Sequence, residues 1–255
     1  MSDSQRLLIT VSSGIAESTA RMAAAKGARV FILANREQEC AALVASLPDA
    51  GYAVTDVSNE TQVDAGVQKA FATLGGIDGV FNVAGLSGRS AGDGPLHTCT
   101  SEAWTLMMDV HAKGTFQVCR AVIARWMAET EPRPRSIVNL GSVLARYPQR
   151  DYFATNAYAA SKGAIEAMTV SAAAYYAPHG IRLNVVTPGL VRTPMSSRAQ
   201  QNPEILSFIK DKQPLYGNLV SADDIAKVAL FLLSEDAAAI TGEIIRADGG
   251  WAVSG

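Results

Sequence analysis

A tyrosine and a lysine, Tyr158 and Lys162, stand four residues apart in an alanine-rich stretch that predicts a helix. Side chains four residues apart lie on one face of a helix, so the ammonium of Lys162 would lie beside the phenol of Tyr158. A phenol titrates near ~10 in water, and a neighbouring cation lowers its pKa by stabilising the phenolate. The pair therefore predicts an acid/base for a substrate oxygen. An aromatic on the core face with a solvated lysine is the alternative.

The elements that must position this pair alternate along the chain. Short apolar runs that predict strands are separated by longer stretches that predict helices. This alternation predicts an α/β fold, a Rossmann-type doubly wound parallel sheet of about seven strands with helices on both faces. The expected strands cover residues 7–10, 28–33, 52–55, 79–83, 136–140, 182–186 and 243–246, and helices are expected over residues 18–26, 61–74 and 157–176.

Ligands of such sheets bind beyond the carboxyl ends of the strands, so chemistry is expected in the residues that follow each run. We expect a single domain over residues 1–255, because one α/β core can bury a chain of this length. Residues 195–216 carry several serine, glutamine and asparagine residues, and we expect them to form a mobile lid over the substrate.

Composition disfavours several classes of protein. The net charge of −2 supplies no excess of cations for nucleic acid or an anionic membrane. Cys40, Cys99 and Cys119 are far apart and fit no metal spacing, so we expect no metal site and a reducing compartment. The N-terminal residues show no basic segment followed by a sustained apolar run, and no apolar run is long enough to span a bilayer. We therefore expect a cytoplasmic protein.

The turn after the first expected strand has features of a phosphate site. Residues 9–16 read Ile-Thr-Val-Ser-Ser-Gly-Ile-Ala and lead from a strand into a helix. Such a turn presents backbone N–H groups and the positive end of the helix dipole to a phosphate. A plain turn with Ser12 or Ser13 capping the helix is the alternative.

These segments resemble the motifs of the classical short-chain dehydrogenase/reductase family over nearly the whole chain. The family's TGxxxGIG, its adenine-contacting pair, NNAG, catalytic serine, YxxxK and PG segment correspond here, in order, to residues 9–16, 56–57, 82–85, Ser142, 158–162 and 187–194. Aligned on Gly14, Thr10 stands in place of the first glycine and Ala16 in that of the third. Because a threonine with positive φ would be strained, we expect a reshaped loop and weakened pyrophosphate binding.

The resemblance implies a nicotinamide dinucleotide cofactor, NADP or NAD. NAD-preferring members place an acidic residue at the end of the second strand, where this chain has Asn35 and Arg36. NADP is slightly favoured, because a guanidinium there could meet a 2′-phosphate; a solvated Arg36 is the alternative. The implied cofactor-binding residues are Ser12, Ser13, Gly14, Ile15, Asn35, Arg36, Asp56, Val57, Asn82, Ala84, Gly85, Tyr158, Lys162, Pro188, Gly189, Val191 and Thr193.

The resemblance also implies the reaction, the interconversion of a secondary alcohol and a ketone by hydride transfer. Ser142 and Tyr158 would bond the substrate oxygen, and Lys162 would lower the pKa of Tyr158 and hold the ribose. His111 replaces an asparagine that in the family holds a water linking the lysine to solvent. We hypothesise that His111 takes over this relay and adds an acidic limb to the rate profile. A buried histidine that satisfies local backbone groups is the alternative.

The substrate pocket is expected between the catalytic serine and the lid segment. Arg146, Arg150 or Tyr152 could bind a polar substrate tail, although loop arginines are often only solvated. The expected walls are Leu86, Ser87, Leu144, Tyr152 and Met195.

Two other functions remain open from the sequence: a non-redox lyase or dehalogenase relative, and a catalytically silent binding protein. Relatives that have given up the nucleotide typically replace the lysine, whereas Lys162 and Asn82 remain here. Members of the family are commonly tetramers that pair the helices around Lys113 and Ala167 and the last strand, so we expect a homotetramer or homodimer. The apolar tail 251–253 would lie at such an interface or fold onto its own subunit.

Overall fold

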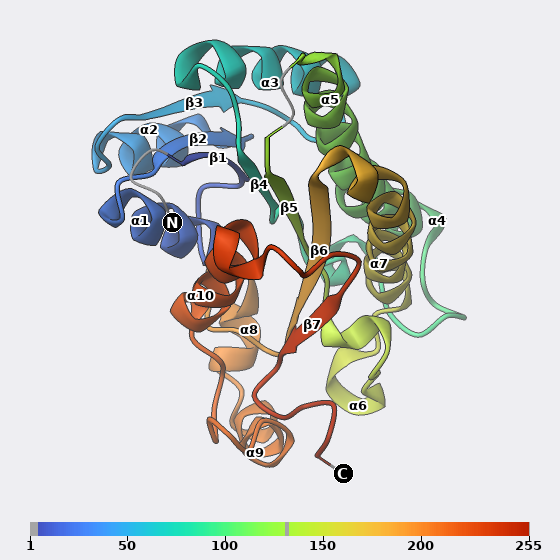
Figure 1. Cartoon of the computed structure of the whole chain (residues 1–255). Coiled ribbons are helices and arrows are strands. Elements are labelled where there is room, and N and C mark those ends of the chain that lie inside the picture. Colours follow the sequence, from blue (N-terminus) through green and yellow to red (C-terminus); the bar gives the residue numbers. More distant parts are fainter. Residues whose placement is uncertain (1–4, 131–132, 255) are drawn as a thin grey trace.

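The computed structural model describes residues 5–130 and 133–254, and its centre is one sheet of seven parallel strands. The order across the sheet is β3-β2-β1-β4-β5-β6-β7 (Figure 1). The predicted fold class is therefore confirmed. The strands are β1 (Arg6–Thr10), β2 (Arg29–Ala34), β3 (Ala50–Val54), β4 (Gly79–Asn82), β5 (Arg135–Leu140), β6 (Ile181–Pro188) and β7 (Ile244–Ala247).

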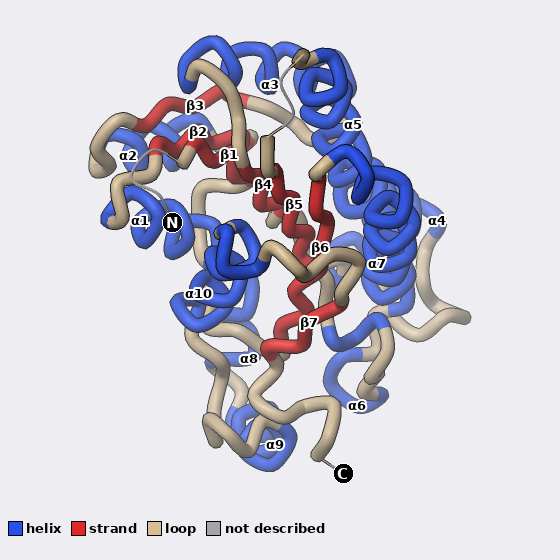
Figure 2. Tube along the Cα trace, viewed as in Figure 1, coloured by secondary structure: helices blue, strands red, loops and turns tan. Residues whose placement is uncertain are grey.

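Helices cover both faces of the sheet, as Figure 2 shows. One face carries α1 (Ile15–Ala25), α2 (Glu37–Ala45) and α10 (Ala222–Leu233). The opposite face carries α3 (Glu60–Leu74), α5 (Gly114–Ala128) and α7 (Asn156–Tyr176). α4 (Ser101–Met107) runs through a π-helical segment, Met108–Lys113, directly into α5.

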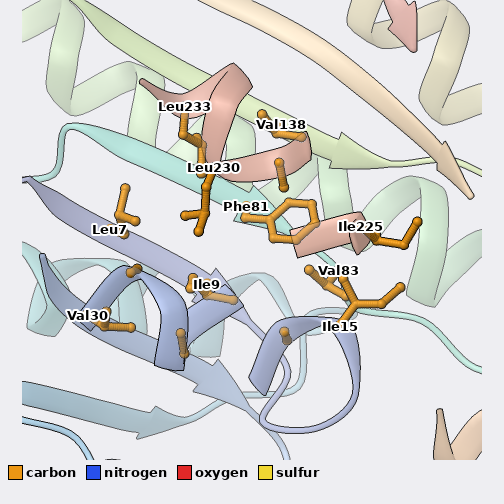
Figure 3. Close-up of a cluster of buried hydrophobic side chains, with 14 of the residues drawn as sticks. Leu7, Ile9, Ile15, Val30, Phe81, Val83, Val138, Ile225, Leu230 and Leu233 are labelled. Atoms are coloured by element: carbon orange, nitrogen blue, oxygen red, sulfur yellow. The ribbon is translucent and has the colours of Figure 1, made fainter. Parts of the chain in front are cut away.

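Strand β1 is apolar at successive positions because both of its faces are buried. Leu7 and Ile9 face the layer of α1 and α10, whereas Leu8 between them faces the layer of α3, α5 and α7, and all three are fully buried. A parallel sheet covered on both sides needs apolar residues at successive positions. Figure 3 shows the first of these layers, where Phe81 of β4 lies beside Leu230 of α10.

A smaller apolar cluster lies beyond the sheet and contains part of the expected lid. Residues 195–216 include α8 (Ser197–Gln200) and α9 (Pro203–Lys212), and Ile205 and Ile209 of α9 are fully buried. The cluster also contains Trp251, whose indole N–H donates to the carbonyl of Tyr147 at 3.1 Å. This part of the tail therefore folds onto its own subunit.

The sheet places its ligand site by topology. The chain proceeds from β1 outward to β2 and β3, then returns to pair β4 with the other side of β1. A crevice opens at such a switch point, beyond the carboxyl ends of the strands. No helix within residues 5–130 and 133–254 has the length and apolar character to cross a bilayer.

Candidate active site

A cavity of about 820 Å³ lies at the carboxyl ends of the strands, within the range of roughly 300–1,000 Å³ usual for small-molecule sites. The structure brings the predicted site residues together at this cavity, with two exceptions. Asn82 lies at the end of β4, where its amide donates to Oδ1 of Asn139 on β5 at 2.8 Å. The Tyr152 ring packs instead against Phe208, with ring centres 5.5 Å apart.

The two arginines considered for a polar substrate tail also lie outside this cavity. Arg146 pairs with the buried carboxylate of Glu166 at 2.6 Å, beside a separate small cavity. Arg150 is 93% exposed and pairs with Asp151. None of these three side chains lines the large cavity, so the geometry argues against a tail-binding role and favours the alternative of arginines that are solvated or paired elsewhere.

Helix α7 presents Tyr158 and Lys162 to the cavity from successive turns. The ammonium nitrogen of Lys162 lies 5.9 Å from the centre of the Tyr158 ring and donates to the carbonyl of Leu140 at 2.8 Å. Ser142 follows β5 and lines the same cavity, close enough to Tyr158 to influence its pKa. The three side chains thus meet at one wall, from a helix and from a strand end.

Burial sets the protonation of this group. It lowers the pKa of Lys162 to about 8, so the side chain still carries its charge at neutral pH. Burial raises the pKa of the Tyr158 phenol, and the nearby hydroxyl of Ser142 opposes that rise. The predicted lowering of the Tyr158 pKa is therefore not seen, because desolvation outweighs stabilisation of the phenolate.

His111 lies in the π-helical segment, fully buried, with both ring nitrogens engaged. Nε2 accepts from the backbone N–H of Leu86 at 2.9 Å, so Nδ1 carries the proton and donates to Oγ of Ser161 at 2.8 Å. Burial, with the charge of Lys162, holds the imidazole pKa well below 6.5. The geometry supports the alternative of a satisfied buried histidine and argues against the hypothesis of a relay with an acidic limb.

The predicted phosphate end lies at the start of α1. Gly14 precedes the helix with φ +60°, and neither Ser12 nor Ser13 caps it with a side chain. A Cβ at Gly14 would lie 3.1 Å from the Thr193 side chain, so the small residue lets the loop after β1 approach the loop after β6. Ser12, Ser13, Gly14 and Ile15, at the start of α1, line the cavity, and a helix N-terminus is a favourable place for an anion.

Comparisons with known proteins agree on one family. The sequence pattern of the family described as Enoyl-(Acyl carrier protein) reductase matches residues 9–252. The chain is 37% identical over 246 residues to momilactone A synthase of Oryza sativa subsp. japonica, covering 94% of this chain and 87% of that protein. It is 35% identical over 243 residues to 2,5-dichloro-2,5-cyclohexadiene-1,4-diol dehydrogenase of Sphingobium indicum, covering 94% and 93%.

A solved gluconate 5-dehydrogenase from Burkholderia cenocepacia, in complex with NADP and tartrate, has a TM-score of 0.88 at 28% identity, covering 98% of this chain and 96% of that chain. The chain belongs to the classical short-chain dehydrogenase/reductase family. It is an NAD(P)-dependent oxidoreductase acting on CH–OH donors.

The glycine motif of this dehydrogenase/reductase differs from the predicted alignment. Thr10 ends β1 in extended backbone, and the residue with positive φ is Val11, at +75°. Oγ1 of Thr10 accepts the backbone N–H groups of Val83 and Ala84, at 2.8 and 2.9 Å. Thr10 therefore takes the place of the fingerprint's threonine and Val11 that of its first glycine, in a loop one residue shorter before Gly14.

Several residues at the site of this dehydrogenase/reductase were missed by sequence reasoning. Glu39 of α2 lines the cavity and pairs with Arg36 at 2.8 Å. Asp93 caps α7, because its two oxygens accept the N–H groups of Ala157 and Tyr158 at 3.0 and 2.9 Å. A glutamate in a surface helix and an aspartate between two glycines are too common to single out. Two further missed residues, Arg89 and Arg198, also line the cavity.

Proposed function

We propose that the enzyme interconverts a secondary alcohol and a ketone, with Ser142, Tyr158 and Lys162 as catalytic residues. The observation that supports this is the meeting of the three side chains at the wall of one large cavity. Ser142 and Tyr158 would hold the substrate oxygen by hydrogen bonds. In reduction the oxygen takes the phenolic proton of Tyr158, and the alcohol oxygen returns it in oxidation. A bound nicotinamide supplies or accepts the hydride.

Replacement of the phenol tests this assignment. Tyr158→Phe should lower kcat by about 100-fold or more, because the proton donor is lost. In the wild type, kcat/KM for alcohol oxidation should rise with pH over roughly pH 6 to 9, since oxidation needs the phenolate and burial raises the pKa of Tyr158. Ketone reduction needs the protonated phenol and should show no such rise. Steady-state rates in both directions decide; undiminished turnover by Tyr158→Phe would rule out the proposal.

The proposed cofactor site fits the residues present. The N–H groups at the start of α1 would hold the pyrophosphate, and Asp56 and Val57 after β3 would meet the adenine. Pro188, Gly189, Val191 and Thr193 would lie against the nicotinamide end.

We propose a preference for NADP over NAD, carried by Asn35 and Arg36 and limited by Glu39. Glu39 already pairs with Arg36, and its charge would repel a 2′-phosphate. Glu39→Gln should tighten NADP binding by about threefold or more, with NAD binding unchanged. Fluorescence titration measures both affinities. Glu37→Gln is the matched control, since Glu37 lies on the same helix but not at the cavity; equal effects of Glu39→Gln on the two cofactors would contradict the assignment.

We further propose a single domain over residues 1–255, with 195–216 acting as a lid, a cytoplasmic location and a homotetrameric or homodimeric assembly. The lid proposal is supported by Met195, Ser196 and Arg198, which precede α9 in the sequence and line the cavity. The assembly is supported by large apolar side chains exposed on α5 and α7, among them Phe116, Met127 and Val170.

A further inference from the structure

Two arginines from separate segments of the chain converge at the substrate end of the cavity. Arg89 follows β4, and Arg198 lies on α8; both line the cavity together with Leu144 and Met195. Both guanidinium groups donate to the same acceptor, the carbonyl of Tyr152, Arg198 at 3.3 Å. A guanidinium has five N–H donors, so each side chain keeps donors for another partner.

These two charges lack an ionic partner within the described residues 5–130 and 133–254. Asp93 is the carboxylate whose charge acts on the pKa of Arg89, but its two oxygens already accept the N–H groups of Ala157 and Tyr158. The carboxylates that line the cavity, Glu39 and Asp56, lie by β2 and β3 at the opposite end.

The two guanidinium groups also act on one another. Burial and the charge of Arg198 lower the pKa of Arg89, although an arginine keeps its charge at any physiological pH. Bringing like charges together is unfavourable, and an anion between them would relieve the repulsion while forming charge-assisted hydrogen bonds.

We propose that Arg89 and Arg198 form a subsite for a carboxylate of the substrate, so that the enzyme acts on hydroxy or oxo acids. The fork of a guanidinium matches the two oxygens of a carboxylate. The apolar walls, which include Leu144, Phe153 and Met195, fit a hydrocarbon body between the acid and the reacting carbon. Both arginines are exposed at the mouth whereas Ser142 is buried, so the acid lies outermost. This inference rests on the proposed reaction.

Charge-matched substrates test the subsite. A panel of straight-chain and cyclic hydroxy acids is compared with the corresponding methyl esters. The wild type should favour acids over esters by about tenfold or more in kcat/KM. Arg89→Gln and Arg198→Gln keep an amide N–H for the Tyr152 carbonyl and remove the charge; each should raise KM for acids by about tenfold or more and leave the ester rates within about twofold. Arg198→Lys should keep part of the preference, because it keeps the charge.

Arg192→Gln is the matched control, since Arg192 is an exposed arginine that does not line the cavity and bonds Asn218 instead. A binding measurement is independent of turnover: calorimetry of the enzyme saturated with its preferred dinucleotide, titrated with hexanoate or with hexanamide. Hexanoate should bind about tenfold or more tightly than the neutral amide, and the double variant Arg89→Gln/Arg198→Gln should abolish that difference.

The outcomes separate the subsite from the reaction. Equal losses for acids and esters in both variants would show that the arginines only tie the loops to Tyr152, and would overturn the subsite. Turnover of neutral alcohols with no preference for acids and no difference between hexanoate and hexanamide would do the same while leaving the reaction intact. If no hydroxy acid or ester in the panel reacted, the proposed reaction would fail, and the calorimetry would still decide the subsite.

Discussion

At the scale of single residues, His111 shows how packing decides chemistry. Its ring is held on one side by the N–H of Leu86 and on the other by Ser161, which in turn donates to the carbonyl of Tyr158. A Cβ at Gly85 would lie 3.0 Å from Nε2, so a glycine is needed where this large side chain fills the space. We therefore expect His111 to position the start of α7 rather than to relay a proton.

The buried neutral state of His111 predicts a specific pH dependence of stability. Its folded pKa lies well below 6.5, so the unfolded chain binds the proton first as the pH falls. The free energy of unfolding should therefore drop below pH ~6.5 by up to about 1.4 kcal/mol per pH unit from this group. His111→Asn should lessen that slope and leave the pH profile of kcat unchanged on its acidic side. Denaturant unfolding at several pH values measures the slope.

His179→Asn is the control for this experiment, since His179 lies on the surface far from α7's first turn. If the slope of His111→Asn equalled that of the wild type, the imidazole would not be held neutral. An acidic limb of the rate that vanished in His111→Asn would instead restore the relay.

The sequence could predict that Ser142, Tyr158 and Lys162 lie together at one cavity, but it could not predict their environment. Tyr158, Lys162 and Ser142 stand in motifs of fixed spacing, so their positions followed from pattern alone. The direction of the Tyr158 pKa shift depends on how deeply neighbouring elements cover the phenol, which no local pattern contains. Arg89 and Arg198 are distant in sequence and meet only because the segment after β4 and helix α8 fold over the same cavity.

At the scale of elements, the tie between β1 and β4 holds the cofactor end together. The hydroxyl of Thr10 accepts two backbone N–H groups where β4 passes into its loop, and it is buried. The strand at residues 7–10 was predicted and β1 includes it, but the residue with positive φ was assigned to the wrong position. A loop shorter by one residue cannot be recognised when an alignment is anchored on Gly14 alone.

Removal of that hydroxyl should destabilise the fold. Thr10→Val keeps the shape of the side chain and leaves the buried N–H of Val83 and the part-buried N–H of Ala84 without an acceptor, which should cost about 2 kcal/mol or more in the free energy of unfolding. Thr10→Ser keeps the acceptor and should lose clearly less. Urea unfolding of the three proteins measures the difference. If Thr10→Val were as stable as Thr10→Ser, the hydroxyl would not be the tie between the two strands.

At the scale of the whole molecule, the strands of the sheet could be predicted better than the placement of the C-terminal tail. The inner strands β1, β2 and β4 are largely apolar because both of their faces are covered, and the seven predicted runs correspond to the seven strands. The ends of the chain were less predictable: Trp251 is 2% exposed against its own subunit, whereas Val253 is 81% exposed. Sequence alone left both placements of the tail open, since an apolar residue fits either one.

The proposed assembly can be tested on the outer face of α5 and α7. Phe116 and Met127 are eleven residues apart on α5, about three helical turns, so they lie on the same side of that helix, and Val170 of α7 is 43% exposed. As a homodimer or homotetramer, the wild type should have a solution mass of two or four times 26.8 kDa. Val170→Glu places a charge in the proposed interface and should reduce the mass by half or more, because an unpaired buried charge is strongly unfavourable.

Leu96→Glu is the matched control: Leu96 is 73% exposed in the loop before α4, and the same change there should leave the mass unaltered. Light scattering measures the solution mass of both variants. If Val170→Glu kept the wild-type mass, the interface would not include this face of α7.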